Sequence, residues 1–246
     1  MEVTYSVIIP VYNAEKTLPE LLQLLGTFFE DKLREPYEII LVDDYSLDNS
    51  WAKILELAAR DSRIKAVKLA RNFGQHNAIV CGLHYSCGKY VITMDDDLQH
   101  NPDDILKLIN KMEETGADAV IAKLAEKKHR WLKRLASDLN RKLAEIAINK
   151  PKGLYLSSFR LIKRQVVDEM LETDFPYPYI PALIFRATGN VVNADVVHRP
   201  RKYGASNYSA YKMFKLAGQL TINNRLIMKL IRKDKPAYTV EKVINL

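Results

Sequence analysis

The residues with the clearest chemical potential are three consecutive aspartates, Asp95 to Asp97, followed two residues later by Gln99. Carboxylate and amide oxygens are the ligands that hard cations such as Mg²⁺ and Mn²⁺ prefer. The alternating residues Asp95, Asp97 and Gln99 are spaced to face one ion together. Such an ion would neutralise the charge on a departing diphosphate. This run therefore predicts a Mg²⁺ or Mn²⁺ site that handles phosphate-bearing substrates.

A structural alternative for the aspartates is the capping of a helix, because acidic residues favour helix N-termini. The next helix is expected to begin near Pro102, and Asn101 is its better N-cap, with Asp103 and Asp104 in the first turn. These residues already fulfil the capping role. Three consecutive carboxylates also repel one another, which a cation would offset, so we favour metal binding.

The elements that must position these residues alternate between apolar strands and amphipathic helices. That alternation is typical of a parallel sheet covered on both faces. Ligands bind outside the carboxyl ends of such strands, and four strand ends here carry polar residues. We therefore expect one crevice at that edge. The expected strands are Ser6–Pro10, Glu38–Val42, Ile64–Leu69, Tyr90–Met94 and Ala117–Ala122, and the expected helices cover residues 18–25, 51–58 and 105–112.

The second half of the chain is less regular. At 246 residues the whole chain is expected to form one compact body. Cys81 and Cys87 lie in an apolar stretch without metal-site or disulfide spacing, so we expect buried free thiols. After residue 122 we expect a strand over Leu154–Ile162, a helix over Gln165–Leu171, a loop with Pro176, Pro178 and Pro181, and a strand over Val191–Val197.

The charge is divided unevenly along the chain, whose net charge is +7. Residues 1–122 carry 12 basic and 20 acidic residues, whereas residues 123–246 carry 25 and 10. An acidic half suits metal ions, and a basic half suits phosphates, nucleic acid or an anionic membrane. The basic half lacks aromatic-stacking motifs and a recognition helix, which argues against nucleic acid. No apolar run reaches the ~18 residues of a spanning helix, and no leader-like segment precedes the first strand.

Three ordered motifs resemble glycosyltransferase family 2, in its dolichol-phosphate mannose synthase-like, polyprenyl-phosphate branch. They are the opening Val7–Asn13, the run Arg71-Asn72-Phe73-Gly74 and the stretch Val91–Pro102. The resemblance covers residues 5–220. It implies the GT-A fold, an α/β fold with a mostly parallel sheet flanked by helices, and a nucleoside diphosphate sugar as the donor.

The resemblance also implies roles for individual residues. Pro10, Tyr12 and Glu15 match positions that contact the nucleoside, and Asp44 matches the acid that contacts the base. The metal and diphosphate site matches Asp95, Asp97 and Gln99, and we place Asp96 against the donor as well. Two positions depart from the family's pattern: Tyr45 replaces the usual glycine, and Asp96 stands where a small residue is common.

The acceptor is indicated by the residue types of the second half. A transferase that glycosylates a hydroxyl needs a carboxylate base, whereas a phosphate acceptor is already ionised and needs basic side chains instead. Family members acting on sugars carry a Glu-Asp pair, but this chain has Arg160 in the corresponding region, where the lipid-phosphate branch has an arginine. Asp168-Glu169 is a reversed pair on an expected solvated helix face. Arg160 is thus the candidate for positioning the acceptor phosphate.

A basic loop and a basic tail follow. Arg201, Gly204 and Ser206 resemble the branch's Arg-x-x-Gly-x-Ser motif, in which Arg201 and Lys202 would stabilise the leaving diphosphate. We expect a catalytic domain over residues 1–209 and, over 210–246, a basic amphipathic segment suited to an anionic membrane surface. The sequence thus predicts an inverting transferase, with Asp97, Arg160 and Arg201 in the catalytic roles.

The expected partners are a nucleoside diphosphate sugar and a polyprenyl phosphate, met at the cytoplasmic face of a membrane. Two alternatives stay open. One is a family member that glycosylates a saccharide hydroxyl in cell-surface polysaccharide assembly. The other is a non-catalytic nucleotide-binding module or a receiver-like domain, in which Lys123 would be the required lysine. The sequence does not decide whether the chain forms a homo-oligomer.

Overall fold

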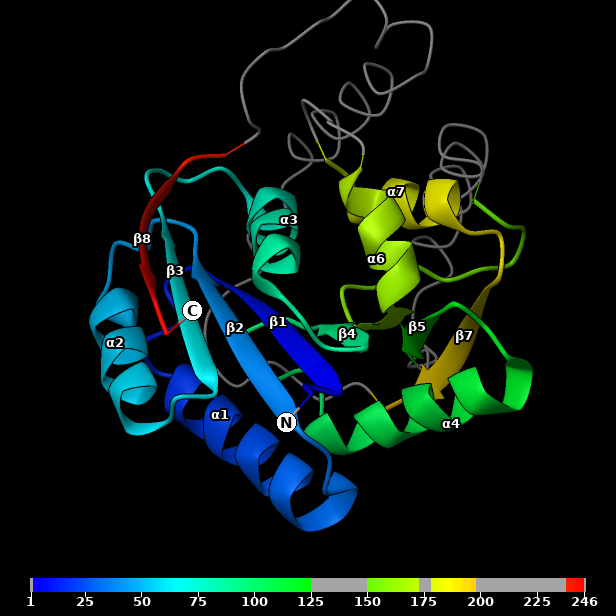
Figure 1. The fold of residues 1–246 in the computed structure, drawn as a ribbon, viewed down its shortest axis with the longest axis horizontal. Coiled ribbons are helices and arrows are strands. Elements are labelled where there is room, and N and C mark those ends of the chain that lie inside the picture. Colours follow the sequence, from blue (N-terminus) through cyan, green and yellow to red (C-terminus); the bar gives the residue numbers. More distant parts are fainter. Residues whose placement is uncertain (1, 125–149, 173–177, 198–237, 246) are drawn as a thin grey trace, which may run out of the picture.

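The computed structural model describes residues 2–124, 150–172, 178–197 and 238–245. They form one eight-stranded sheet in the order β7-β5-β6-β4-β1-β2-β3-β8 (Figure 1), which confirms the predicted α/β class. The strands are β1 (Tyr5–Val11), β2 (Tyr37–Asp43), β3 (Ile64–Leu69), β4 (Tyr90–Thr93), β5 (Ala119–Leu124), β6 (Arg160–Lys163), β7 (Val191–Val196) and β8 (Val240–Ile244).

The central strands are parallel and nearly all buried. β1 pairs in parallel with β2 and with β4, and β2 pairs in parallel with β3. The register places Val11 opposite Asp43, and Ile8 opposite Thr93. The polar residues that follow these strands therefore gather at one edge. In contrast, β6 runs antiparallel to β4 and β5, and β8 runs antiparallel to β3.

Helices cover both faces of the sheet (Figure 1). Because side chains alternate along a strand, Val7 and Ile9 pack with α1, α2 and α4, whereas Ile8 packs with α3, α6 and α7. The helices are α1 (Leu18–Thr27), continued by a π-helical turn η1 (Phe28–Leu33), α2 (Ser50–Arg60), α3 (Gln75–Tyr85), a 3₁₀ turn η2 (Pro102–Asp104), α4 (Ile105–Thr115), α6 (Arg164–Leu171) and α7 (Ile180–Ala187).

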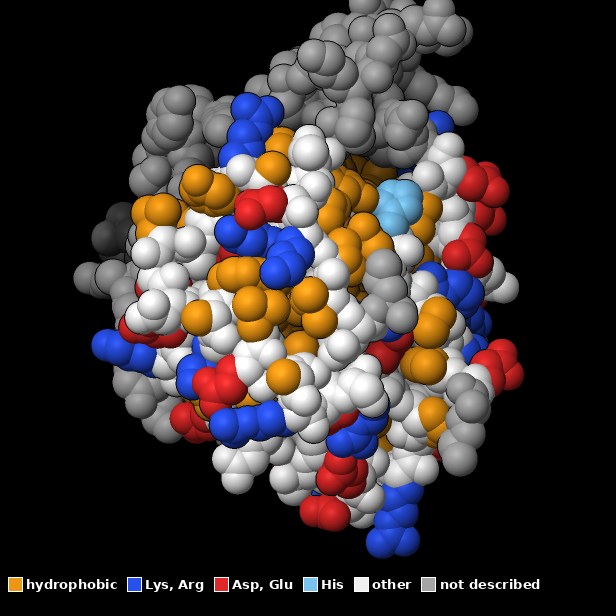
Figure 2. Space-filling view, turned by 60° about the vertical axis from the view of Figure 1, so that its left-hand side comes forward, with side chains coloured by type: hydrophobic (Ala, Val, Ile, Leu, Met, Phe, Trp, Pro, Cys, Tyr) orange, Lys and Arg blue, Asp and Glu red, His pale blue; other side chains and the backbone are white. Residues whose placement is uncertain are grey.

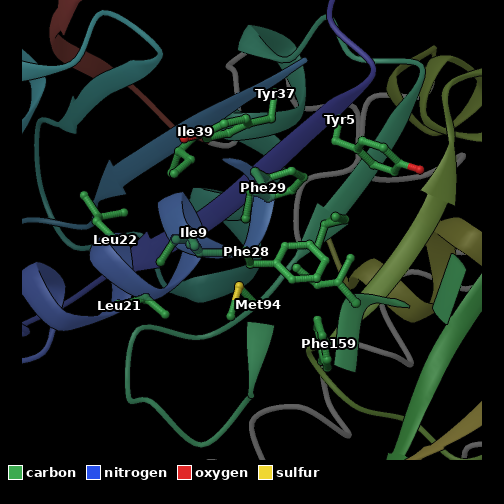
Figure 3. Packing of buried hydrophobic residues seen from close by; sticks show 14 of the residues in the cluster. Tyr5, Ile9, Leu21, Leu22, Phe28, Phe29, Tyr37, Ile39, Met94 and Phe159 are labelled. Carbon is green, nitrogen blue, oxygen red and sulfur yellow. The ribbon is translucent and has the colours of Figure 1, made fainter. Parts of the chain in front are cut away.

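An aromatic cluster fills the core beneath the start of β1 (Figure 3). Phe29 stacks on Tyr37 with ring centroids 4.4 Å apart and meets Phe28 edge-on at 5.1 Å. Both phenylalanines come from η1, and both are fully buried. Such pairs add to the free energy gained from burying apolar area. These contacts hold η1 against the sheet at the first residues of β1 and β2.

Several sequence expectations need correction. The segment expected as a strand over Leu154–Ile162 is extended in β6 only from Arg160, and the residues before it form a loop. The expected proline loop contains α7, because Pro181 lies in the first helical turn, where a missing N–H is tolerated. Cys81 is buried but Cys87 is exposed, and both are free. The helix α3 and the strand β8 were not anticipated.

The residues of β8 close one edge of the sheet. The expected domain boundary after residue 209 lies outside the described residues, but Val240–Ile244 pairs with β3 within the main sheet. Figure 2 turns this side of the molecule forward and shows a patch of hydrophobic side chains flanked by acidic and basic ones. Over the part of the chain that the structure describes, no helix is long and apolar enough to cross a membrane.

A buried polar network lies at the amino-terminal ends of the central strands, opposite the end that carries the acid cluster. The Glu38 carboxylate accepts hydrogen bonds from Ser6 Oγ (2.6 Å) and the Cys87 backbone N–H (2.8 Å), and it pairs with Lys65 Nζ at 2.7 Å. The Gly88 backbone N–H donates to Ser6 Oγ at 2.7 Å. This close approach leaves no space for a side chain at position 88.

Replacing Gly88 by alanine should destabilise the fold. The added Cβ would lie 2.6 Å from the Ser6 backbone N and 2.8 Å from the Tyr5 carbonyl carbon, and backbone atoms cannot rotate away. We expect Gly88→Ala to lower the free energy of unfolding by about 2 kcal/mol in urea titrations. Gly189→Ala is the matched control, because nothing lies within 4 Å of its Cβ position. Equal stability of the two variants would contradict this packing.

Candidate active site

The loops after β1 and β2 are joined by hydrogen bonds. Asn13 Oδ1 accepts from the Leu47 N–H (2.7 Å), the Asn13 N–H donates to Ser46 Oγ (3.0 Å), and the Ala14 N–H donates to Ser50 Oγ (2.7 Å). Asn13 itself has a left-handed backbone, with φ of 56°. These contacts make the two loops one rigid unit at the carboxyl edge of the sheet.

Exposed apolar side chains project from this unit. Tyr12 is 40% exposed, Tyr45 43% and Leu47 77%, which are high values for large hydrophobic residues. Tyr45 has a φ of 64°, a conformation that glycine adopts more readily and that orients this side chain outward. The substitution of the family's usual glycine therefore adds an aromatic ring to the rim of the site.

Two of the predicted nucleoside-contacting residues have structural partners. Glu15 Oε2 accepts from the Asn49 N–H at 3.0 Å, directly before α2, so the side chain also braces the loop after β2. Pro10 is buried within β1, opposite Val42. Of the predicted set on β1 and its loop, Tyr12 is the one whose ring is openly accessible.

Asp44 is buried and holds the loop after β3. Its two carboxylate oxygens accept from the backbone N–H groups of Phe73 (2.7 Å) and Gly74 (2.8 Å). Asn72 Nδ2 donates to the Asp44 carbonyl at 3.1 Å. Burial raises the pKa of Asp44 to about 6, although the two amides favour its charged form. Asp44 thereby connects the end of β2 to the start of α3.

The acid cluster lies between β1 and β6. Asp95 accepts at one oxygen from Gln75 Nε2 (2.6 Å) and at the other from Ser158 Oγ (2.5 Å). Asp96 turns toward β1 and accepts from the Tyr12 N–H at 3.1 Å. Burial raises the pKa of Asp96 to about 7, and the negative charges of Asp95 and Asp97 raise it too. The cluster thus concentrates negative charge at the end of β4, and these donors to Asp95 and Asp96, all from the described residues, are neutral groups.

The chemistry of the predicted metal ligands fits a hard cation. Asp95, Asp97 and Gln99 offer oxygen donors only, and Asp97 Oδ1 also accepts from the Gln99 N–H at 3.1 Å, which closes a tight turn. Leu98, within this turn, has a left-handed φ of 62°. Among the described residues, no three His, Cys, Asp or Glu side chains are grouped to hold a metal by themselves. Substrate oxygens and water would have to complete the coordination.

Arg160 is a buried cation beside this cluster. It is 4% exposed, and its Nη1 donates to Thr93 Oγ1 at 3.3 Å, while Nε has no hydrogen-bond partner. Burial lowers its pKa to about 10, although the nearby charge of Asp95 opposes this. Within the described residues, no carboxylate forms an ion pair with it at 4.0 Å or less. Arg160 is therefore a buried residue of β6 and not a solvent-exposed one.

Some predicted residues cannot be placed, and others were missed. Arg201, Lys202 and Ser206 lie outside the described residues. Gln75 and Ser158, which hold Asp95, were not anticipated as site residues. Gln75 directly follows the Arg71–Gly74 motif, and Ser158 lies two residues before Arg160. Their closeness in sequence to these predicted site residues is the feature that could have identified them.

The sheet and the acidic site at its carboxyl edge define the class of GT-A proteins, and comparisons with known proteins agree. The profile of the family described as "Glycosyl transferase family 2" matches residues 6–171. The chain belongs to this family. It is 38% identical over 213 residues to an undecaprenyl-phosphate 4-deoxy-4-formamido-L-arabinose transferase of Proteus mirabilis (strain HI4320). That match covers 86% of the chain but 64% of the relative's length.

Solved structures share the fold at low sequence identity. Glucosyl-3-phosphoglycerate synthase from Mycobacterium tuberculosis, in complex with Mn²⁺ and UDP-glucose, aligns with a TM-score of 0.65 and 18% identity, covering 97% of this chain and 86% of that one. S. aureus TarS 1–349 with UDP-GlcNAc aligns with a TM-score of 0.58 and 18% identity, covering 90% and 67%. These likenesses confirm the predicted GT-A fold.

The raised pKa of Asp44 should be measurable as a pH dependence of stability. The folded state binds this proton with a pKa of about 6, against an ordinary value of 3.8, so ionisation above pH 4 weakens folding. Asp44→Asn removes this titration. The unfolding free energy of the wild type should therefore fall relative to Asp44→Asn by up to about 3 kcal/mol between pH 4 and 7, in urea titrations with EDTA. Parallel pH profiles would contradict the assignment.

Proposed function

We propose that this chain transfers a sugar, with inversion, from a nucleoside diphosphate sugar to a polyprenyl phosphate. Membership of the family and the 38% identity to a transferase named for undecaprenyl phosphate support this. The main support is the burial of Arg160 near Asp95. Among the described residues this guanidinium makes one hydrogen bond, to a neutral hydroxyl, and a buried cation is costly without an anion. An acceptor phosphate would supply that anion.

The donor would lie across the ends of β1 and β2. Tyr12 is accessible there, and Pro10, Glu15 and Asp44 shape the loops around it. Asp95 and Asp97, with Gln99, would hold Mg²⁺ or Mn²⁺, and a bound cation would neutralise the leaving diphosphate. Arg201, Lys202 and Ser206 remain proposed contacts to the donor. The concentration of three carboxylates at one strand end, two of which meet neutral donors among the described residues, supports a bound cation.

The acceptor would react from the β6 side of the cluster. A phosphate oxygen attacks the anomeric carbon, the bond from that carbon to the diphosphate oxygen breaks, and the electron pair leaves with the diphosphate. The reaction inverts the anomeric carbon because attack and departure occur on opposite faces. Arg160 would hold the nucleophile while its charge offsets the repulsion between two anions. No proton has to be removed from an ionised phosphate.

The alternative of a saccharide hydroxyl acceptor would require a carboxylate base. Asp168 and Glu169 are exposed on α6, and Asp168 pairs with Arg164 at 3.7 Å. The other acids described after residue 150, Glu172, Asp195 and Glu241, are exposed as well. These positions favour the phosphate acceptor.

The receiver-like alternative would need Lys123 as its lysine, and this side chain pairs with Asp195 at 3.3 Å.

A polyprenyl acceptor would be met at a membrane. We propose that the chain works at the cytoplasmic face, in peripheral contact through the basic residues of 210–233, which lie outside the described residues. Attraction of basic side chains to anionic lipids would contribute to that contact. The relative's undecaprenyl phosphate is itself a lipid, which supports this location.

Loss of the metal site should abolish transfer. Removing divalent ions with EDTA is expected to stop sugar transfer, and Mn²⁺ or Mg²⁺ should restore it. Asp97→Ala should lower kcat by about 100-fold or more, because the leaving charge is no longer offset. Asp103→Ala is a suitable control, since that exposed acid pairs with Lys32 at 2.6 Å outside the cluster. Full metal-dependent turnover of Asp97→Ala would exclude this site.

Arg160 should govern use of the acceptor. Arg160→Lys retains the charge but not the planar guanidinium, and we expect the KM for polyprenyl phosphate to rise about 10-fold with little change for the donor. Arg60→Lys serves as the control, because that exposed arginine pairs with Glu56 on α2. Transfer that reaches saccharide acceptors alone, and that is unaffected in Arg160→Lys, would favour the hydroxyl alternative instead.

A further inference from the structure

A histidine with no assigned role lies next to Arg160. His76 is in the first turn of α3, and its ring meets the Tyr179 ring edge-on, with centroids 4.9 Å apart. Arg160 is close enough that its charge lowers the pKa of His76, and burial lowers that pKa more, to about 3. The imidazole is therefore neutral at physiological pH and adds no positive charge to that of Arg160.

The ring of His76 has an enclosed atom without a partner. The residue as a whole is half-buried, but its Nδ1 atom is buried and has no hydrogen-bond partner among the described residues. Arg160 Nε, on β6, is buried and likewise without a partner in the described part of the chain. Buried polar atoms are nearly always paired. Of the three unpartnered atoms among the described residues, Asn77 Oδ1 is an acceptor, whereas His76 Nδ1 and Arg160 Nε belong to side chains close enough to interact electrostatically and can both donate, which favours a shared anionic ligand.

The position of Arg160 along the sheet separates it from the proposed donor side. The strands run β6-β4-β1-β2 across the site, with Arg160 on β6, the acid cluster after β4, and Tyr12 and Asp44 after β1 and β2. Arg160 thus lies on the β6 side of the acid cluster, and the residues proposed for the nucleoside lie on the other side. His76 lies in the first turn of α3, which packs on β1 and β2, and its ring reaches toward the Arg160 side through its contact with Tyr179 at the start of α7. A ligand held by the pair would face the donor across the cluster.

We propose that His76 is a second contact to the acceptor phosphate, with Nδ1–H donating a hydrogen bond to a phosphate oxygen that Arg160 also binds. This inference rests on the proposed function. A guanidinium and a neutral N–H donor together satisfy more than one oxygen of a phosphate without repelling each other. The N-terminal end of α3 favours an anion at the same place. Tyr179 fixes the ring orientation through its edge contact.

The test is direct binding of farnesyl phosphate, a short polyprenyl monophosphate, to the full chain by isothermal titration calorimetry, with farnesol and inorganic phosphate as comparison ligands. His76→Ala should raise the Kd for farnesyl phosphate by about 10-fold, the effect expected for losing a hydrogen bond to an anion. His76→Asn places an amide N–H near the position of Nδ1 and should recover much of the affinity, whereas His76→Gln places it near Nε2 and should not.

His84→Ala is the matched control, because this exposed histidine lies on the same helix against Tyr238, away from Arg160. Unchanged farnesyl phosphate affinity in His76→Ala, alongside weakened binding in Arg160→Lys, would overturn the role of His76 and leave the proposed function intact. If the wild type binds farnesyl phosphate no better than farnesol, both proposals fail. If His76→Ala unfolds, the difference between His76→Asn and His76→Gln decides, and equal affinities would overturn the role.

Discussion

Three neighbouring carboxylates at the end of β4 are the constraint around which the edge of this sheet is organised. Burial raises the pKa of Asp96, and the negative charges of Asp95 and Asp97 on either side of it raise that pKa further. The fold distributes them by giving each a different partner. Asp95 accepts hydrogen bonds from α3 and from the loop before β6, Asp96 accepts one from the loop after β1, and Asp97 accepts one within its own turn. The arrangement joins segments distant in sequence at one acidic point.

The direction of the strands determines which charges face this point. Parallel strands bring their ends together, so the loops after β1, β2 and β4 share one edge. β6 runs the other way, and its first residue, Arg160, therefore lies opposite Thr93, the last residue of β4. The antiparallel strand β6 thus places the Arg160 guanidinium at the same end of the sheet as the aspartates that follow the parallel strand β4. The acid cluster and the guanidinium thus place opposite charges close to each other at this edge.

Residues predicted to contact the donor also support the loops at this edge of the sheet. Asp44 uses both carboxylate oxygens on backbone amides of the loop before α3, and Glu15 braces the loop before α2. A rigid loop keeps accessible side chains such as Tyr12 in place, which is how preorganised sites limit the entropy lost on binding. The family motif at Arg71–Gly74 is explained in part by this support, because its amides are the partners of Asp44.

The sequence alone determined the family, the parallel strands of the first half and the acid cluster, because these depend on local periodicity and on contiguous motifs. It did not determine α7, where proline suggested a loop, or β8, whose partner β3 is more than 170 residues away. Nor did it show that Arg160 is buried, or that Gln75, His76 and Ser158 converge on it and on Asp95. Burial and long-range pairing arise from how distant segments pack, and no local pattern encodes them.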